Sequence, residues 1–184
     1  NKVCGSGMKA VMLGMDIIKA GSASVVAAGG MESMTNAPYL LPNARAGMRL
    51  GHGQVKDHMF LDGLEDAYDK GQLMGTFAEA TAGKYEFSRE DQDNYTIESV
   101  NRAKNAITEG KFAEEIVPVT IKTRKGEVTV DTDEQPGNAK VDKIPQLRPA
   151  FSKDGTVTAA NSSSISDGAA AMILMSEVEA EKRG

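Results

Sequence analysis

The residue best suited to chemistry is the single cysteine, Cys4, which lies in the run Cys4-Gly5-Ser6-Gly7 directly before a predicted helix. The thiolate is the nucleophilic form of cysteine, and a helix N-terminus lowers the pKa of a thiol beside it. The glycines on either side of Ser6 allow a tight turn and a close approach of substrate. The run is therefore typical of a nucleophile elbow. An ordinary buried cysteine is the commoner fate of a lone Cys, and both interpretations stay open here.

A second candidate is the small polar run Thr156–Ala171, which leads into a predicted buried strand. Ser162, Ser163 and Ser164 follow Asn161 there, and such a loop offers hydroxyl and backbone groups to a ligand that carries amides. A solvated serine-rich turn fits the same residues and, from these residues alone, is the preferred interpretation.

Two histidines, His52 and His58, are the side chains that would most often serve a cysteine nucleophile as base. Both lie in an irregular stretch, Met31–Gly63, and no sequence pattern connects either to Cys4. We expect both on the surface, although the sequence leaves their distance from Cys4 open. No ligand cluster surrounds them, and Asp62 with its acidic neighbours is expected to form a solvated face, so no metal site is predicted.

The elements that must position these residues are short and follow an α/β order. Met8, Val11, Met12 and Met15 form a helical stripe closed by Lys19 and Gly21, and Gly14 within it indicates a close packing contact. Two apolar runs, 23–28 and 169–175, are predicted as buried strands, the first of them ended by Gly29-Gly30. Between them the sequence predicts helices over 74–85 and 88–110, the second with a capping box at Ser88 and Asp91, strands over 116–122 and 127–131, and a linker over 132–149.

Composition narrows the functional classes. The chain has 184 residues and a net charge of −5, which argues against nucleic-acid binding through global charge. Mean hydropathy is −0.34, and no apolar run is long enough to span a membrane. One cysteine excludes a disulfide framework within the chain and a Cys-rich zinc site, and indicates a reduced compartment, the cytoplasm.

Several motifs together resemble the thiolase family, and they cover essentially the whole chain. Asn1–Ala10 is similar to the nucleophile motif of that family. Further matching segments follow in family order: Ala28–Met34, Leu73–Gly75, Ser88–Asp93, Leu147–Phe151, Gly155–Asn161 and Asp167–Ala171. The chain looks most like the acetyl-CoA acetyltransferase (acetoacetyl-CoA thiolase) branch.

The resemblance implies a thiolase-like α/β fold in which residues 1–34 and 151–184 form part of an N-terminal α/β domain. Residues 35–150 would form a loop domain that binds coenzyme A and carries a tetramerisation loop. Cys4 would be the nucleophile that becomes acylated. The pantetheine and acyl pocket would be lined by Leu64, Met74, Phe151, Ala159 and Ser163, with Ser163 bonded to a pantetheine amide.

The implied reaction is the reversible condensation of two acetyl-CoA to acetoacetyl-CoA and CoA, or thiolysis of a 3-oxoacyl-CoA, through an acyl-cysteine. The coenzyme A thioester would be the substrate, no other cofactor is expected, and the assembly would be a homotetramer in acyl-CoA and fatty acid metabolism.

Three departures from the family pattern accompany the resemblance. Leu73 stands where acetoacetyl-specific members often have His, and Pro136-Gly137 replaces an Arg near the CoA phosphates, with Lys140 and Lys143 as candidate replacements. The Gly-His-Pro motif and the second, acid/base cysteine do not occur. We therefore expect a missing C-terminal thiolase domain, a sequence incomplete at both ends, and no turnover by this chain alone. The alternative is a non-catalytic CoA-binding or scaffold fragment of the same fold.

Overall fold

A computed structural model describes all residues, 1–184, and divides them into two compact units. The first unit comprises Asn1–Met74 and Ser164–Gly184, and the second comprises Gly75–Ser163. Both helices and strands occur, as the predicted α/β class requires. The division into units does not test the domain boundaries expected at 34 and 150, which stay a prediction.

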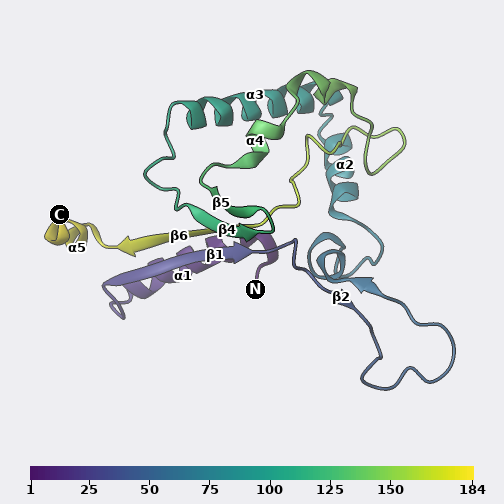
Figure 1. The fold of residues 1–184 in the computed structure, drawn as a ribbon, viewed down its shortest axis with the longest axis horizontal. Coiled ribbons are helices and arrows are strands. Elements are labelled where there is room, and N and C mark those ends of the chain that lie inside the picture. Colours follow the sequence, from purple (N-terminus) through teal and green to yellow (C-terminus); the bar gives the residue numbers. More distant parts are fainter. The chain divides into compact units, whose positions relative to one another are not determined.

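The first unit is built on helix α1 (Ser6–Lys19) and the antiparallel strands β1 (Val25–Glu32) and β6 (Gly168–Met175). The helix lies along the strand pair (Figure 1). Gly14 makes this possible, because a Cβ there would lie 2.8 Å from Leu174 Cδ1 and 3.2 Å from Val26 Cγ1. The close packing contact predicted at Gly14 is therefore confirmed.

Strand β1 differs from its prediction in two ways. It does not end at Gly29-Gly30 but continues to Glu32, because both glycines stay in register, opposite Ala171 and Ala170. Burial of β1 on both faces is also wrong, since Ala28 is its one buried residue and Met31 is 87% exposed. Strand β6 has no buried residue at all.

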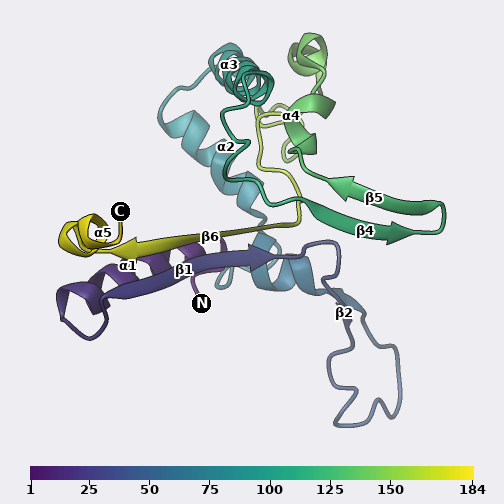
Figure 2. The ribbon, with the colours of Figure 1, turned by 60° about the vertical axis from the view of Figure 1, so that its left-hand side comes forward.

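The stretch between β1 and α2 is irregular, as predicted, but it contains short elements. Strands β2 (Tyr39–Leu40) and β3 (Lys56–Asp57) pair with each other at the base of an extended loop (Figure 2). A single π-helical turn, Phe60–Leu64, follows directly. Because β2 and β3 pair, the chain that leaves the loop at Lys56 returns beside the strand from which the loop began.

The second unit holds helices α2 (Met74–Lys84, whose first residue belongs to the first unit) and α3 (Arg89–Thr108). The predicted capping box is confirmed, because the Ser88 side chain accepts from the Asp91 backbone N–H and Asp91 accepts from that of Ser88. The Ser88 hydroxyl, which donates to the Asp91 carboxylate at 2.6 Å, and then the Ser88 N–H hold the pKa of Asp91 below its usual value. The predicted hairpin is also present, as β4 (Val119–Thr123) and β5 (Gly126–Val130).

The linker predicted over 132–149 is wrong in its central part. Helix α4 (Glu134–Asn138) and a 3₁₀ helix, Val141–Gln146, occupy it. The side chain of Asp133 caps α4 by accepting from the Gln135 N–H, and Pro136 lies in the first turn, where a missing N–H costs little. The last helix, α5 (Glu177–Arg183), is capped in the same way by Ser176.

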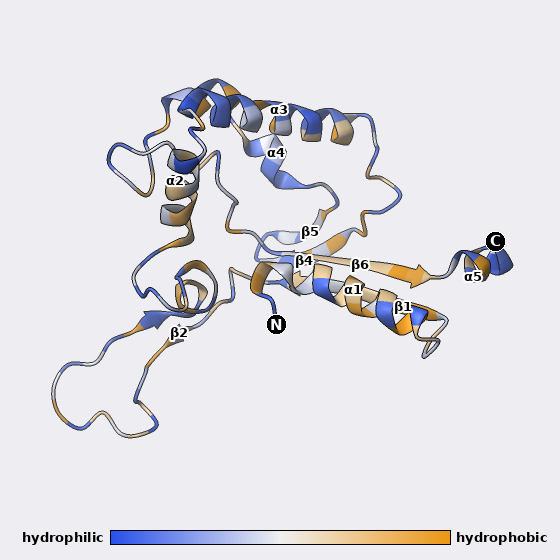
Figure 3. Ribbon diagram, turned by 180° about the vertical axis from the view of Figure 1, so that it is seen from behind, coloured by the Kyte–Doolittle hydropathy of each residue, from blue (hydrophilic) through white to orange (hydrophobic).

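Few apolar side chains are buried within this chain. The buried apolar residues are Ala28, Ala82, Ile144 and Val157, whereas Met8, Met12, Leu13 and Ile17 of α1 remain exposed. In Figure 3, apolar colour lies along α1, β1 and β6. Apolar surface of this extent normally marks an interaction face. None of the helices combines the length and apolarity that crossing a membrane requires.

Candidate active site

Cys4 lies in a 3₁₀ turn, Val3–Gly5, that runs directly into α1. The Gly5 N–H donates to the Lys2 carbonyl at 3.0 Å and closes the turn. The thiol is free and exposed in residues 1–184. The expected position, a tight turn at the N-terminus of a helix, is confirmed.

The residue before the cysteine has an unusual backbone conformation. Val3 adopts φ +50°, which is left-handed and rare for a β-branched residue. Such a conformation costs an L-residue about 1–2 kcal/mol. Backbone strain of this kind is found at functional sites, where surrounding contacts maintain it.

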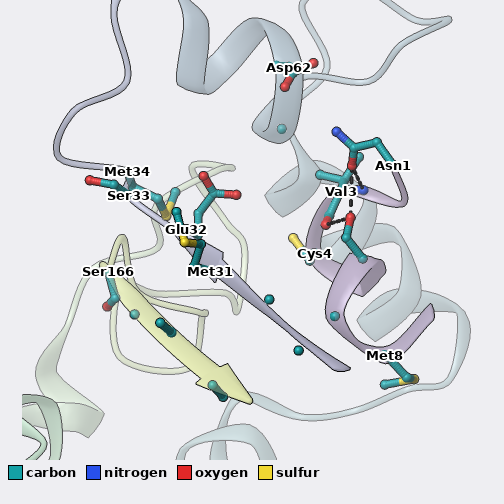
Figure 4. A pocket seen from close by; sticks show the side chains of 18 of the residues that line it. Asn1, Val3, Cys4, Met8, Met31, Glu32, Ser33, Met34, Asp62 and Ser166 are labelled. Carbon is teal, nitrogen blue, oxygen red and sulfur yellow. Dashed lines mark hydrogen bonds between the residues drawn. The ribbon is translucent and has the colours of Figure 1, made fainter. Parts of the chain in front are cut away.

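A cavity of about 1120 Å³ opens beside Cys4, entirely within the first unit. Three segments form most of its wall: the Cys4 turn with the start of α1, the ends of β1 and β6, and the chain before and through the π-helical turn (Figure 4). The backbones of Gly7 and Gly30 meet there, since a Cβ on Gly30 would lie 3.1 Å from Gly7 Cα. The lining is rich in methionine: Met8, Met31, Met34, Met59 and Met172. Such flexible apolar side chains adapt to varied ligand shapes.

The predicted binding residues fall into two groups. Leu64 lines the Cys4 cavity, so the structure brings these two together. Met74 begins α2 and is partly exposed. Phe151, Ala159 and Ser163 belong to the second unit, where the Phe151 ring packs on the backbone of Gly75. Their role in binding stays a prediction.

The segment that carries Ala159 and Ser163 is held by a polar network inside the second unit. The Glu79 carboxylate accepts from the backbone N–H groups of Thr156 and Val157, both at 2.9 Å. Asn161 accepts from the Thr158 N–H at 2.6 Å, and Thr158 is fully buried. Ala159 and Ser163 are exposed beside these anchored residues. The network fixes the backbone while leaving both side chains accessible.

Of the two histidines whose distance from Cys4 the sequence left open, His58 is the one that lies at the site. It lines the same cavity as Cys4, and its Nε2 lies 3.8 Å from Asp62 Oδ2, which lines the cavity too. Its side chain is 41% exposed, whereas the exposed His52 is not part of the cavity wall. The available signal was the i, i+4 spacing of His58 and Asp62 just before Leu64. No group of three or more His, Cys, Asp or Glu residues is arranged to hold a metal ion.

Asp167 lies between Ser166 and Gly168, two residues that line the cavity. Its carboxylate accepts from the Thr35 backbone N–H at 2.9 Å and from the Ser33 hydroxyl at 3.2 Å. The Thr35 N–H is the main reason that the pKa of Asp167 lies below its usual value. Ser33 and Met34 line the cavity, so this carboxylate fixes part of the wall.

Comparison with known proteins gives a consistent result. The profile of the thiolase N-terminal domain matches residues 1–178. An acetyl-CoA acetyltransferase of Rhizobium meliloti is 50% identical over 185 residues, covering 100% of this chain and 47% of the relative. One from Saccharomyces cerevisiae is 53% identical over 180 residues, covering 96% of this chain and 45% of the relative. The chain thus spans about half the length of the curated relatives it matches, and it belongs to the thiolase family through that family's N-terminal domain.

Proposed function

We propose that the protein carrying residues 1–184 is a thiolase-type acyltransferase with Cys4 as its nucleophile. Its substrates would be acetyl-CoA or a 3-oxoacyl-CoA thioester. The observation that carries this proposal is the exposed thiol at the start of a 14-residue helix, opening onto a cavity shared with Leu64. Membership of the thiolase family, and relatives named acetyl-CoA acetyltransferase, support the same reaction class.

In the condensation direction, the Cys4 thiolate attacks the thioester carbonyl carbon of acetyl-CoA. The tetrahedral oxyanion collapses, the bond to the CoA sulfur breaks, and that sulfur leaves as a thiolate that takes up a proton. A second acetyl-CoA loses a proton from its methyl group, and the resulting carbanion attacks acetyl-Cys4. Acetoacetyl-CoA forms and the Cys4 thiolate is regenerated. Thiolysis is the same sequence in reverse, with ping-pong kinetics expected in either direction.

The proton transfers need groups other than Cys4. The thiolase resemblance assigns them to a Gly-His-Pro histidine and a second cysteine, and neither motif occurs in residues 1–184. We propose that the other half of the complete protein, the C-terminal thiolase domain, supplies both. Residues 1–184 alone are then inactive.

Coenzyme A would be held by Leu64, Met74, Phe151, Ala159 and Ser163. The exposed Ser163 side chain beside the anchored segment supports a hydrogen bond to a pantetheine amide. The exposed apolar residues of α1, β1 and β6 support coverage by the C-terminal domain. The extended loop between β2 and β3 supports pairing of copies into a homotetramer, and we assign the enzyme to cytoplasmic acyl-CoA metabolism.

The test is to trap the acyl-enzyme in the complete protein. Acid quenching after incubation with isotopically labelled acetyl-CoA, followed by peptide mass spectrometry, should place the label on Cys4. Cys4→Ala should abolish both the label and the turnover of acetoacetyl-CoA, whereas Ser22→Ala, a surface control, should change neither. Turnover that survives in Cys4→Ala would contradict the assignment. Coenzyme A binding without any acylation would favour the scaffold alternative.

A further inference from the structure

The conformation of Val3 determines where the Cys4 thiol points. Only one peptide bond separates the two residues, so a change in the backbone of Val3 swings Cys4 directly. Val3 keeps φ +50° although left-handed backbone is disfavoured for valine. Neighbouring groups must therefore hold it.

Two polar side chains hold both peptide groups that flank the Val3 Cα. Asn1 Oδ1 accepts from the Val3 N–H at 2.7 Å. On the other side, the Ser6 hydroxyl lies 2.8 Å from the Val3 carbonyl oxygen, to which it donates. Fixing both groups fixes φ and ψ of Val3 together.

The Ser6 hydroxyl also joins the two anchors into one unit. It lies 2.9 Å from Asn1 Oδ1, and it accepts from the Lys2 N–H at 2.9 Å. Because a hydroxyl has one proton, Asn1 Oδ1 and the Val3 carbonyl share that donor. Dashed lines in Figure 4 mark the hydrogen bonds among the residues drawn beside Cys4.

We propose that Ser6, together with Asn1, is a positioning residue for Cys4. Its hydroxyl maintains the left-handed Val3 and thereby aims the thiol into the cavity. This inference rests on the proposed role of Cys4 as nucleophile. It assigns to Ser6 a function distinct from starting α1, because its bonds go to Lys2, Val3 and Asn1, all of which precede the helix.

The experiment compares two reactions of the same thiol in the complete protein. Acylation by acetyl-CoA requires a correctly aimed sulfur, whereas alkylation by iodoacetamide requires only an accessible thiolate. In Ser6→Ala we expect the acylation rate to fall about three- to tenfold, because the bonds of the hydroxyl to Val3, Asn1 and Lys2 are lost. The KM for acetyl-CoA and the rate of Cys4 alkylation, followed on its peptide by mass spectrometry, should be unchanged.

Two variants separate positioning from a structural role. Ser6→Thr keeps the hydroxyl and should restore acylation. Ser176→Ala removes a comparable hydroxyl, which caps α5 by accepting from the Glu179 N–H, and should leave acylation unchanged.

The decisive background is Val3→Gly, because glycine adopts left-handed φ without strain. In the Val3→Gly background, Ser6→Ala should slow acylation much less than it does in the protein that keeps Val3. An equal loss in both backgrounds, or normal acylation in Ser6→Ala, would overturn the inference. If Cys4 of the wild-type protein were alkylated by iodoacetamide but never acylated by acetyl-CoA, the proposed function itself would be refuted.

Discussion

One carboxylate in each unit holds a chain segment by accepting from backbone N–H groups, but the surroundings of the two carboxylates differ. Asp167, in the first unit, accepts from the Thr35 N–H and holds the start of the extended loop. Glu79, in the second unit, accepts from the N–H groups of Thr156 and Val157 and holds the segment leading to Ser163. Asp167 is exposed, whereas the bonds of Glu79 are partly buried and Val157 is 5% exposed.

The surroundings determine what each carboxylate contributes. Around Glu79, the Thr156 hydroxyl accepts from the Gln92 side chain at 2.9 Å, and Asn161 donates to the Thr156 carbonyl at 3.0 Å. Removing one member of a partly buried network of this kind lowers stability, because the remaining polar groups lose their hydrogen-bond partners. Water competes for the donors that Asp167 holds. We therefore expect the segment that Glu79 holds to be rigid. The start of the loop that Asp167 holds should come free when acid protonates this carboxylate.

The largest expected effect comes from the most buried charge of the second unit. Asp93 is 4% exposed, and its Oδ2 accepts from Arg89 Nε at 2.6 Å. Arg89 also donates to the Ile144 and Leu147 carbonyl oxygens, so the pair ties α3 to the 3₁₀ helix beyond α4. Asp93→Ala leaves a partly buried guanidinium unpaired and should lower the free energy of unfolding by about 3 kcal/mol or more.

Urea unfolding followed by circular dichroism measures this change. The comparison would fail if Asp93→Ala were no more destabilising than a change at an exposed ion pair.

Glu79→Gln should have the next largest effect. Glutamine keeps the length but has one acceptor oxygen in place of two, and its amide places N–H donors against those of Thr156 and Val157. We expect the local opening free energy to fall by about 1–3 kcal/mol. Hydrogen exchange of the Thr156 and Val157 amides should accelerate accordingly. Glu127→Gln, on the exposed strand β5, is the matched control and should leave these amides unchanged.

Acid should release the Asp167 contact only at low pH. The lowered pKa of Asp167 means that its stabilising contribution is complete above the unfolded value of about 3.9 and disappears as pH falls through the lower folded value. The amide resonance of Thr35 should therefore titrate with a midpoint below that unfolded value.

Asp167→Asn should abolish this titration while leaving the Asp91 capping box, which titrates in the same direction, intact. A Thr35 resonance that still titrates in Asp167→Asn would show that another group holds the loop.

Local features of the sequence predicted the local structure. Cys4 at a helix start, the Ser88 capping box and the packing at Gly14 each depend on neighbouring residues or on one small side chain. The two carboxylate contacts could not be predicted in this way, because Thr35 lies 132 residues from Asp167 and Thr156 lies 77 from Glu79.

Spatial neighbours that chain topology brings together were missed for the same reason. His58 reaches the Cys4 cavity only because β2 and β3 pair and return the loop, with the His58 N–H donating to the Pro38 carbonyl at 3.0 Å. Two-residue strands leave almost no periodic signal. The extension of β1 through its glycines was missed because glycine normally ends strands, whereas here it accommodates Ala170.

The smallest effect should come from an ion pair with good geometry but full exposure. Arg102 Nε lies 2.7 Å from Glu98 Oε1 on α3, and the two side chains are 78% and 60% exposed. Both this pair and Arg89–Asp93 have i, i+4 spacing on the same helix, but Arg89–Asp93 is more buried and Arg89 has further bonds to carbonyl oxygens. Glu98→Ala should change the free energy of unfolding by about 0.5 kcal/mol or less, since water screens exposed charges and alanine favours helix. Urea unfolding of Glu98→Ala and Asp93→Ala, measured side by side, gives the two free energies. Added salt should reduce the already small effect of Glu98→Ala further. Equal losses in the two variants would mean that burial is not what separates strong from weak polar contacts in this chain.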